Sequence, residues 1–161
     1  MKSLLPSVVA GGLLATCLSA TAAGVRVEFS DPAKFTDIGR AYGPERDNAL
    51  EGIRRHLEQA GGRLLPPDEQ LTVTVTDLDL AGSFEQSQRY SREARVVRRT
   101  YPPRIDLAFR LTKGDTVVKE GTRSLRDTTF NESLRYKDDA LGYEKMMLDR
   151  WLRNEFPKPA K

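Results

Sequence analysis

Hydrophobic residues alternate with polar ones most regularly between Tyr101 and Asp127. The hydrophobic positions of the first half are Ile105, Leu107, Phe109 and Leu111. This period of two is typical of a strand with one buried face. The segment 113–115 (Lys-Gly-Asp) predicts a tight turn, after which Val117 and Val118 begin a returning strand. The stretch therefore predicts a β-hairpin whose apolar face must be covered by other elements.

Two earlier segments alternate in the same way. Residues 25–29 place valine or phenylalanine at odd positions, and residues 71–75 place leucine or valine there. The hydrophobic positions then change from odd to even numbers, at Leu78 and Leu80. Because a one-residue shift turns side chains to the other face, we expect a β-bulge near Thr76-Asp77.

Two segments have helical spacing. The first begins near Pro44, which suits a first helical turn, and ends at Gly61-Gly62. Its apolar stripe consists of Leu50, Ile53, Leu57 and Ala60. The second follows Asp138 and Asp139, either of which can cap a helix, and ends before Pro157. Its stripe consists of Leu141, Met147, Leu148, Trp151 and Leu152.

The predicted order is strand, helix, strand, strand, strand, helix. This order favours an α+β fold: a two-layer sandwich of about four mainly antiparallel strands, with both helices on one face. The other face is expected to be polar, with Thr72, Thr74, Asp106 and Arg110 on it. The sequence contains no internal repeat or linker, so residues 23–161 are expected to form one domain.

Residues 1–22 have the pattern of a cleaved signal peptide. Lys2 precedes a broken apolar run, and the segment 20–22 (Ala-Thr-Ala) offers a peptidase site. The apolar run is too short for a membrane span, which needs about 20 apolar residues. We therefore expect a periplasmic protein with no transmembrane segment in the mature chain.

Cys17 leaves a second possibility for the amino terminus. The segment 14–17 (Leu-Ala-Thr-Cys) is similar to the lipobox of bacterial lipoproteins, in which the cysteine is lipidated. Thr16 departs from the Gly, Ala or Ser usual before that cysteine, which favours simple cleavage after Ala22. A lipid-anchored outer-membrane assembly subunit remains the alternative.

Charge and composition exclude several classes of function. Removal of Lys2 lowers the basic count from 26 to 25 against 23 acidic residues, and the resulting charge of +2 does not favour nucleic-acid binding. Cleavage after Ala22 leaves no thiol for catalysis or disulfides. His56 is the single histidine, and we interpret it as a surface residue beside the apolar stripe. No metal site or cofactor is predicted.

The acidic residues Asp77, Asp79 and Asp106 are the remaining candidates for catalysis. Asp77 and Asp79 lie two apart at a strand end, and Asp106 lies near the start of the next strand. Carboxylates held together there could act as an acid/base pair, as in an envelope hydrolase, or bind a cation through oxygen. The simpler interpretation is that they form ion pairs with nearby arginines such as Arg104 or Arg126.

An arginine-rich run suggests a binding edge instead. The hypothesis assigns binding to Arg92, Arg95, Arg98, Arg99, Arg104 and the aromatic Tyr101. Guanidinium groups suit carboxylates and phosphates. In the periplasm such groups belong to lipids, peptidoglycan and acidic proteins. The simpler alternative is a solvated loop whose charges protect a sheet edge from aggregation.

Four motifs carry a resemblance to a known family. They are TDLDLAG (76–82), PPRIDLAFRL (102–111), SLRD (124–127) and YEKMMLDRWLRNEF (143–156). Together they resemble a family of secreted Gram-negative bacterial proteins designated domain of unknown function 3016. That family carries no known activity, so the resemblance implies no catalytic residues. From the candidate residues above, and not from the resemblance, we expect a non-catalytic periplasmic protein for binding or envelope maintenance, with an anionic envelope component or an acidic protein as partner.

Overall fold

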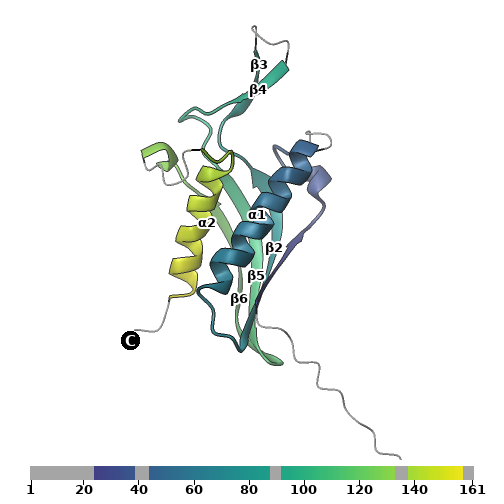
Figure 1. Ribbon diagram of the computed structural model, residues 1–161, viewed down its shortest axis with the longest axis vertical. Coiled ribbons are helices and arrows are strands. Elements are labelled where there is room, and N and C mark those ends of the chain that lie inside the picture. The colour runs from purple at the N-terminus through teal and green to yellow at the C-terminus, as the bar shows by residue number, and fades with distance from the viewer. Residues whose placement is uncertain (1–23, 39–43, 88–91, 133–137, 158–161) are drawn as a thin grey trace, which may run out of the picture.

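Two helices lie side by side on one face of a four-stranded sheet in the computed structural model (Figure 1). The structure describes residues 24–38, 44–87, 92–132 and 138–157, so the predicted signal peptide and Cys17 lie outside the described residues. In spatial order the strands are β1 (Gly24–Phe29), β2 (Glu69–Asp79), β5 (Arg104–Lys113) and β6 (Thr116–Arg126). The helices are α1 (Pro44–Gly62) and α2 (Gly142–Glu155).

The sheet is mixed but mainly antiparallel. β1 runs parallel to β2, with α1 as the connection between them, whereas β2–β5 and β5–β6 are antiparallel pairs. The register aligns Val27, Val73 and Phe109 across three strands, so their side chains share one face. The α+β two-layer sandwich predicted from the pattern is confirmed.

The core lies between that sheet face and the two helices. Leu57 of α1 and Leu148 of α2 are both fully buried against it. At one end of the core, the rings of Phe109, Trp151 and Phe156 contact each other edge to face, with centroids 5.6–5.8 Å apart. Both predicted helical stripes therefore cover the same face, as the pattern required.

The predicted β-bulge is present in β2. The register with β5 shifts between Val75 and Asp77, and Leu78 then pairs with Ile105. Because of this shift Leu78 is fully buried on the core face. Asp77, which pairs with Asp106, turns to the polar face of the sheet instead.

The edge strand β6 places charged side chains over the core. In the register with β5, Lys119 lies opposite Leu111 and Arg123 opposite Leu107, on the covered face. Both cations pair with Glu155 of α2, at 2.7 and 2.8 Å. Inward-pointing charges on an edge strand discourage pairing with another chain.

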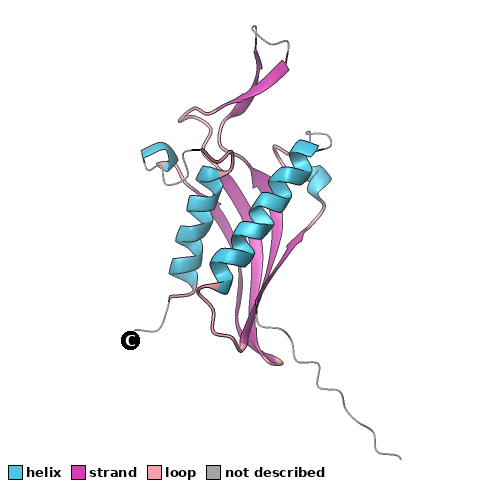
Figure 2. Cartoon of the chain, in the orientation of Figure 1, coloured by secondary structure: helices cyan, strands magenta, loops and turns pink. Residues whose placement is uncertain are grey.

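A two-stranded arm, formed by β3 (Ser83–Ser87) and β4 (Arg92–Val96), projects from one end of the sheet (Figure 2). The sequence did not predict this hairpin, because its polar residues give no apolar alternation. Gly82 at its root has a φ of 93°, and a Cβ there would lie 2.5 Å from the carbonyl oxygen of Val96. β2 ends beside the arm, so β1, which is parallel to it, starts at the opposite end of the sheet.

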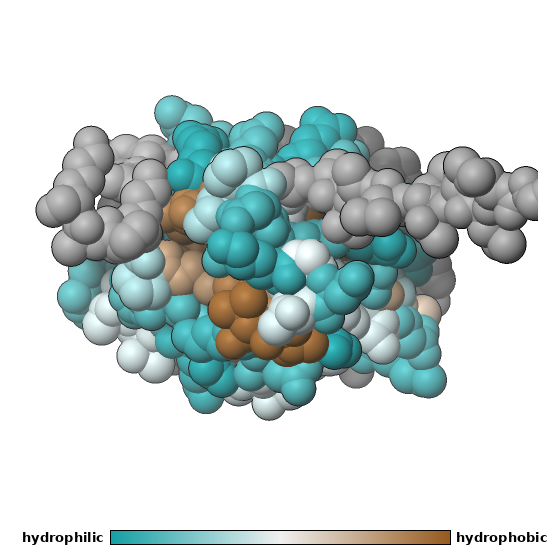
Figure 3. Space-filling view, turned by 90° about the horizontal axis from the view of Figure 1, so that it is seen from below, coloured by the Kyte–Doolittle hydropathy of each residue, from teal (hydrophilic) through white to brown (hydrophobic). Residues whose placement is uncertain are grey.

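That opposite end is seen in Figure 3, where hydrophilic residues surround a small hydrophobic patch. Val117 and Val118, at the start of β6, are 38% and 52% exposed. Within the described residues, no helix has both the length and the apolar composition that crossing a membrane requires.

Candidate functional site

The structure brings the predicted acidic cluster and part of the predicted arginine cluster together at the arm end of the sheet. β2 finishes and β5 begins there, with Asp79 opposite Arg104 and Asp77 opposite Asp106. In the next pair, Arg104 lies opposite Arg126 of β6. Three neighbouring strands therefore contribute opposite charges to one small area of the polar face.

Arg104 is the centre of this ion-pair network. Its Nη2 donates to Asp77 Oδ2 at 2.5 Å, and its Nη1 donates to Asp106. The side chain of Arg104 is 30% exposed, and those of the two carboxylates are 21% and 29% exposed. Ser124 of β6 also donates a hydrogen bond to Asp106, at 2.6 Å. The simpler interpretation of these acids, pairing with a nearby arginine, holds for Asp77 and Asp106.

A loop residue, Thr36, donates two further hydrogen bonds to Asp77. The backbone amide of Thr36 donates to Oδ1 at 2.7 Å and its hydroxyl donates to Oδ2 at 2.6 Å. Burial raises the pKa of Asp77, but hydrogen bonds from Thr36, the Leu78 amide and Arg104 outweigh burial and lower it. The ionised form of Asp77 is thus stabilised, which suits a structural anion.

Asp79 is in a different environment. Burial, and then the nearby Asp37 carboxylate, raise the pKa of Asp79. It borders a small cavity of about 160 Å³, whose other lining residues include Tyr101, Arg104 and Arg126. The cavity has room for water or a small anionic group, but not for a large substrate.

Arg95 is not a free binding residue, contrary to the hypothesis drawn from the sequence. From β4 it donates to Asp37 Oδ2 at 2.6 Å and to the carbonyl oxygen of Ala81 at 3.2 Å. Asp37 Oδ2 also accepts from the Leu80 amide, at 3.3 Å. These contacts fasten the root of the arm to the body. Arg104 is likewise engaged in internal ion pairs, with Asp77 and Asp106.

The buried Glu144 supports the same root from the helical side. It lies in the first turn of α2, is 1% exposed, and accepts a hydrogen bond from the Ala81 amide at 2.7 Å. Its second oxygen, Oε2, has no hydrogen-bond partner among the described residues. Burial raises the pKa of Glu144. We refer to Asp37, Ala81, Arg95 and Glu144 together as the arm clamp.

Other members of the predicted arginine set are on the surface. Arg98, Arg99 and Tyr101 are exposed in the segment between the arm and β5, and Arg126 is exposed at the end of β6. Arg99 makes only a 3.9 Å ion pair with Glu132, and its side chain is 72% exposed. We call Arg98, Arg99, Tyr101 and Arg126 the arginine end. The side chain of Arg92, the remaining predicted residue, lies outside the described residues.

Sequence reasoning missed Thr36, Asp37 and Glu144. Thr36 and Asp37 belong to an irregular loop, and no periodic pattern marks residues that contact a distant strand. Glu144 occupies a position that faces the core in the helical stripe of α2. A charged residue at an apolar helical position is the one signal that could have drawn attention to it.

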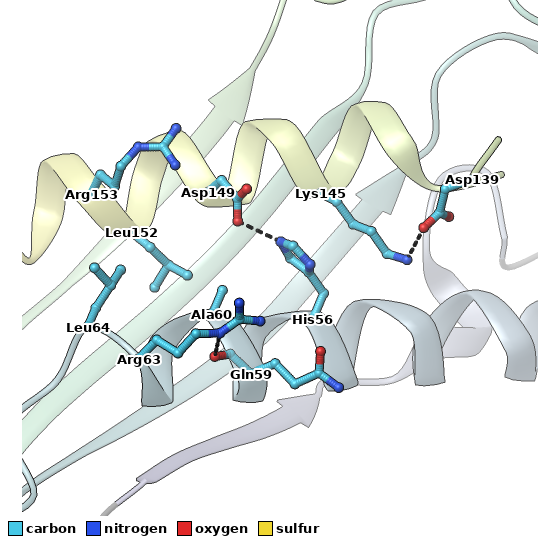
Figure 4. A pocket seen from close by; sticks show the side chains of 10 residues that line it. All are labelled: His56, Gln59, Ala60, Arg63, Leu64, Asp139, Lys145, Asp149, Leu152 and Arg153. Carbon is cyan, nitrogen blue, oxygen red and sulfur yellow. Dashed lines mark hydrogen bonds and ion pairs between the residues drawn. The ribbon is translucent and has the colours of Figure 1, made fainter. Parts of the chain in front are cut away.

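A cavity lined mainly by polar residues, shown in Figure 4, lies along the seam between the two helices. Its volume is about 510 Å³. His56 of α1 contacts Asp149 of α2, with Nε2 and Oδ1 2.8 Å apart, and Lys145 pairs with Asp139 nearby (Figure 4). The side chain of His56 is only 12% exposed, so the prediction of a surface histidine was wrong. It bridges the two helices.

Asp77 and Asp106 are both held by Arg104, and His56 contacts Asp149. The described residues contain no cluster of three or more histidine, cysteine or carboxylate groups placed to hold a metal ion. The exposed guanidinium groups of the arginine end can donate hydrogen bonds to carboxylate or phosphate oxygens.

One of the three comparisons with known proteins identifies a family. No curated protein and no solved structure matched the chain. Residues 23–154 match the family described as "Protein of unknown function (DUF3016)". The match covers both helices almost completely and all six strands. The chain therefore belongs to this family.

Proposed function

We propose that this protein is a non-catalytic binding or envelope-maintenance accessory protein of the periplasm, which engages an anionic partner through the arginine end. The main support for the proposal is that some of the arginines form internal hydrogen bonds, whereas others are exposed to solvent. Arg95 and Arg104 are used internally, whereas Arg99 and Arg126 direct their charge to solvent. The internal pairs hold the strands and the arm root that present the exposed ones.

The exposed groups have the chemistry of anion recognition. A guanidinium group presents a planar set of donors that fits carboxylate and phosphate oxygens in pairs. Tyr101, which is 50% exposed, adds an aromatic face beside them. Phosphates of envelope lipids, carboxylates of peptidoglycan and acidic proteins all offer such oxygens.

The hydrolase alternative has less support. A catalytic carboxylate pair needs one group free to protonate a leaving group and another free to activate water or attack. Asp77 accepts hydrogen bonds from Thr36 and Arg104, and Asp106 accepts from Arg104 and Ser124. Asp79 alone does not make a pair.

The test is retention of the purified protein on phosphatidylglycerol vesicles, on purified peptidoglycan and on envelope proteins. The variant combines Arg98→Ser, Arg99→Ser and Arg126→Ser. The control removes three exposed arginines elsewhere: Arg26→Ser, Arg55→Ser and Arg110→Ser, whose side chains are 69%, 67% and 60% exposed.

We expect the arginine-end variant to lose at least about tenfold in retention on one of these materials, with a steep dependence on salt. The control variant, which has the same net charge, should lose less than about twofold. Equal losses in the two variants, or no loss in either, would contradict the proposal. The mass of the mature amino terminus tests the compartment separately: cleavage after Ala22 supports export as a soluble chain, and a lipidated Cys17 supports the anchored alternative.

A further inference from the structure

A second cavity separates the amino-terminal halves of the two helices. The helices diverge toward the arm end of the sheet (Figure 1), and the cavity between them has a volume of about 580 Å³. This volume falls within the range of small-molecule sites, about 300–1,000 Å³. We call it the wedge. Its apolar lining residues are Ile38, Ala49, Gly52, Leu80, Ala140 and Leu141.

The floor of the wedge is formed by a close contact between the helices. A Cβ at Gly52 of α1 would lie 2.5 Å from Cδ1 of Leu141, so the glycine allows Leu141 to pack directly on the helix backbone. Ala49, one turn earlier, is small as well and leaves the space above that contact unfilled. The cavity therefore exists because two small residues face a diverging neighbour.

The rim of the wedge carries charged groups that are not equivalent. Arg95 and Lys145 lie on the rim, but Asp37 and Asp139 already neutralise them. Glu45, exposed in the first turn of α1, forms no ion pair or hydrogen bond with the described residues.

Each cation of the rim is paired with one carboxylate, Arg95 with Asp37 and Lys145 with Asp139, so Glu45 adds one uncompensated negative charge to the rim. A cationic group at the mouth would therefore be favoured over an anionic one.

We propose that the wedge binds a small molecule with an apolar body and a single amine head group. The apolar body lies on Leu80 and Leu141, and the ammonium group lies at the rim beside Glu45. This ligand chemistry is opposite to that of the arginine end. The inference therefore stands or falls independently of the proposed function.

The test uses three probes that share one apolar body, octylamine, 1-octanol and octanoate, titrated calorimetrically into the purified protein below their micellar concentrations. Octylamine should bind saturably and about threefold more tightly than 1-octanol, because a partly exposed ion pair contributes a factor of about that size. Octanoate should bind most weakly. Equal affinity for the three probes, or a preference for octanoate, overturns the assigned head group.

Two variants locate the site. Glu45→Gln, at an exposed position, should lower octylamine affinity about threefold and leave 1-octanol unchanged, whereas the control Glu58→Gln, exposed on the same helix but outside the wedge, should change neither. Ala49→Phe should fill the wedge and lower the affinity for all probes at least about tenfold. If octylamine binding is absent in the parent, or survives both Glu45→Gln and Ala49→Phe unchanged, the inference is wrong.

Discussion

In the middle of the sheet, Val73 pairs with Phe109, and the side of these residues that faces the helices packs mainly against apolar side chains and rings. At the arm end, the corresponding pairs are Asp77 with Asp106 and Asp79 with Arg104. The first region is stabilised by burial, which is proportional to apolar area and has no preferred direction. The second is stabilised by hydrogen-bonded charges, which work only at specific distances. The same two strands thus pass from one kind of stabilisation to the other within four residues.

This contrast has a consequence for binding. A region held by apolar packing hides its side chains from partners, whereas a region held by surface charges keeps donors within reach of solvent. Residues at the arm end can therefore contact a partner without removing apolar contacts from the core.

The largest expected effect is in the apolar region. Trp151→Ala should lower the free energy of unfolding by about 3–5 kcal/mol, because the indole is 5% exposed and packs against Phe109 and Phe156. Urea denaturation followed by circular dichroism measures this loss. Val118→Ala, at an exposed site, should stay within about 0.5 kcal/mol of the parent. A Trp151→Ala protein that unfolds like the parent would show that the ring lies outside the core.

The charged region should respond less strongly. Arg104→Ala should lower the free energy of unfolding by about 1–2 kcal/mol, since it leaves Asp77 and Asp106 without their cation, although partial exposure reduces the loss. Arg110→Ala, which removes an exposed arginine from the same strand, serves as the control and should have little effect. Similar losses for the two variants would mean that the network contributes nothing beyond ordinary surface charge.

Asp77→Asn should lower the free energy of unfolding by about 1 kcal/mol at pH 7. Because the pKa of Asp77 is lowered by folding, its contribution is present above the unfolded-state pKa and is lost as pH falls through the folded-state pKa. The difference in the free energy of unfolding between the parent and the variant should therefore become smaller below about pH 4. Denaturation curves at pH 3 and pH 7 decide this, and a deficit that is equal at both would contradict it.

The smallest effect has the opposite sign. The pKa of Glu144 is raised by folding, so its contribution is fully present below the unfolded-state pKa and is lost as pH rises through the folded-state pKa. Glu144→Gln removes this loss and keeps an oxygen for the Ala81 amide. Relative to the parent, the variant should gain up to about 1 kcal/mol between pH 4 and pH 8. If the difference in the free energy of unfolding between the variant and the parent is constant over that interval, the pKa of Glu144 is not raised by burial.

The two regions also differ in how far the sequence predicts them. Alternation at Ile105 and Phe109, helical spacing at Leu57 and Leu148, and the change of period after Val75 each follow from the geometry of a single element. They predicted the sandwich, its covered face and its bulge.

The arm end depends instead on contacts between residues far apart in the chain. Thr36 contacts Asp77 across 41 positions, and Asp37 contacts Arg95 across 58. No local pattern of the sequence reveals such pairs. The sequence could suggest that Arg104 forms ion pairs with the neighbouring acids, but it could not show which arginines are paired internally and which are exposed. The arm was not predicted, because its sequence shows no regular alternation of apolar and polar residues.

The position of the first residue of β1 determines at which end of the sheet any upstream segment is attached. β1 begins at the end of the sheet farthest from the arm. A chain held by its amino terminus is therefore attached at one end of the sheet and presents β3 and β4 at the other end. On a form tethered through its amino terminus, the arm and the arginine end would lie at the end of the sheet opposite the point where the tether joins it.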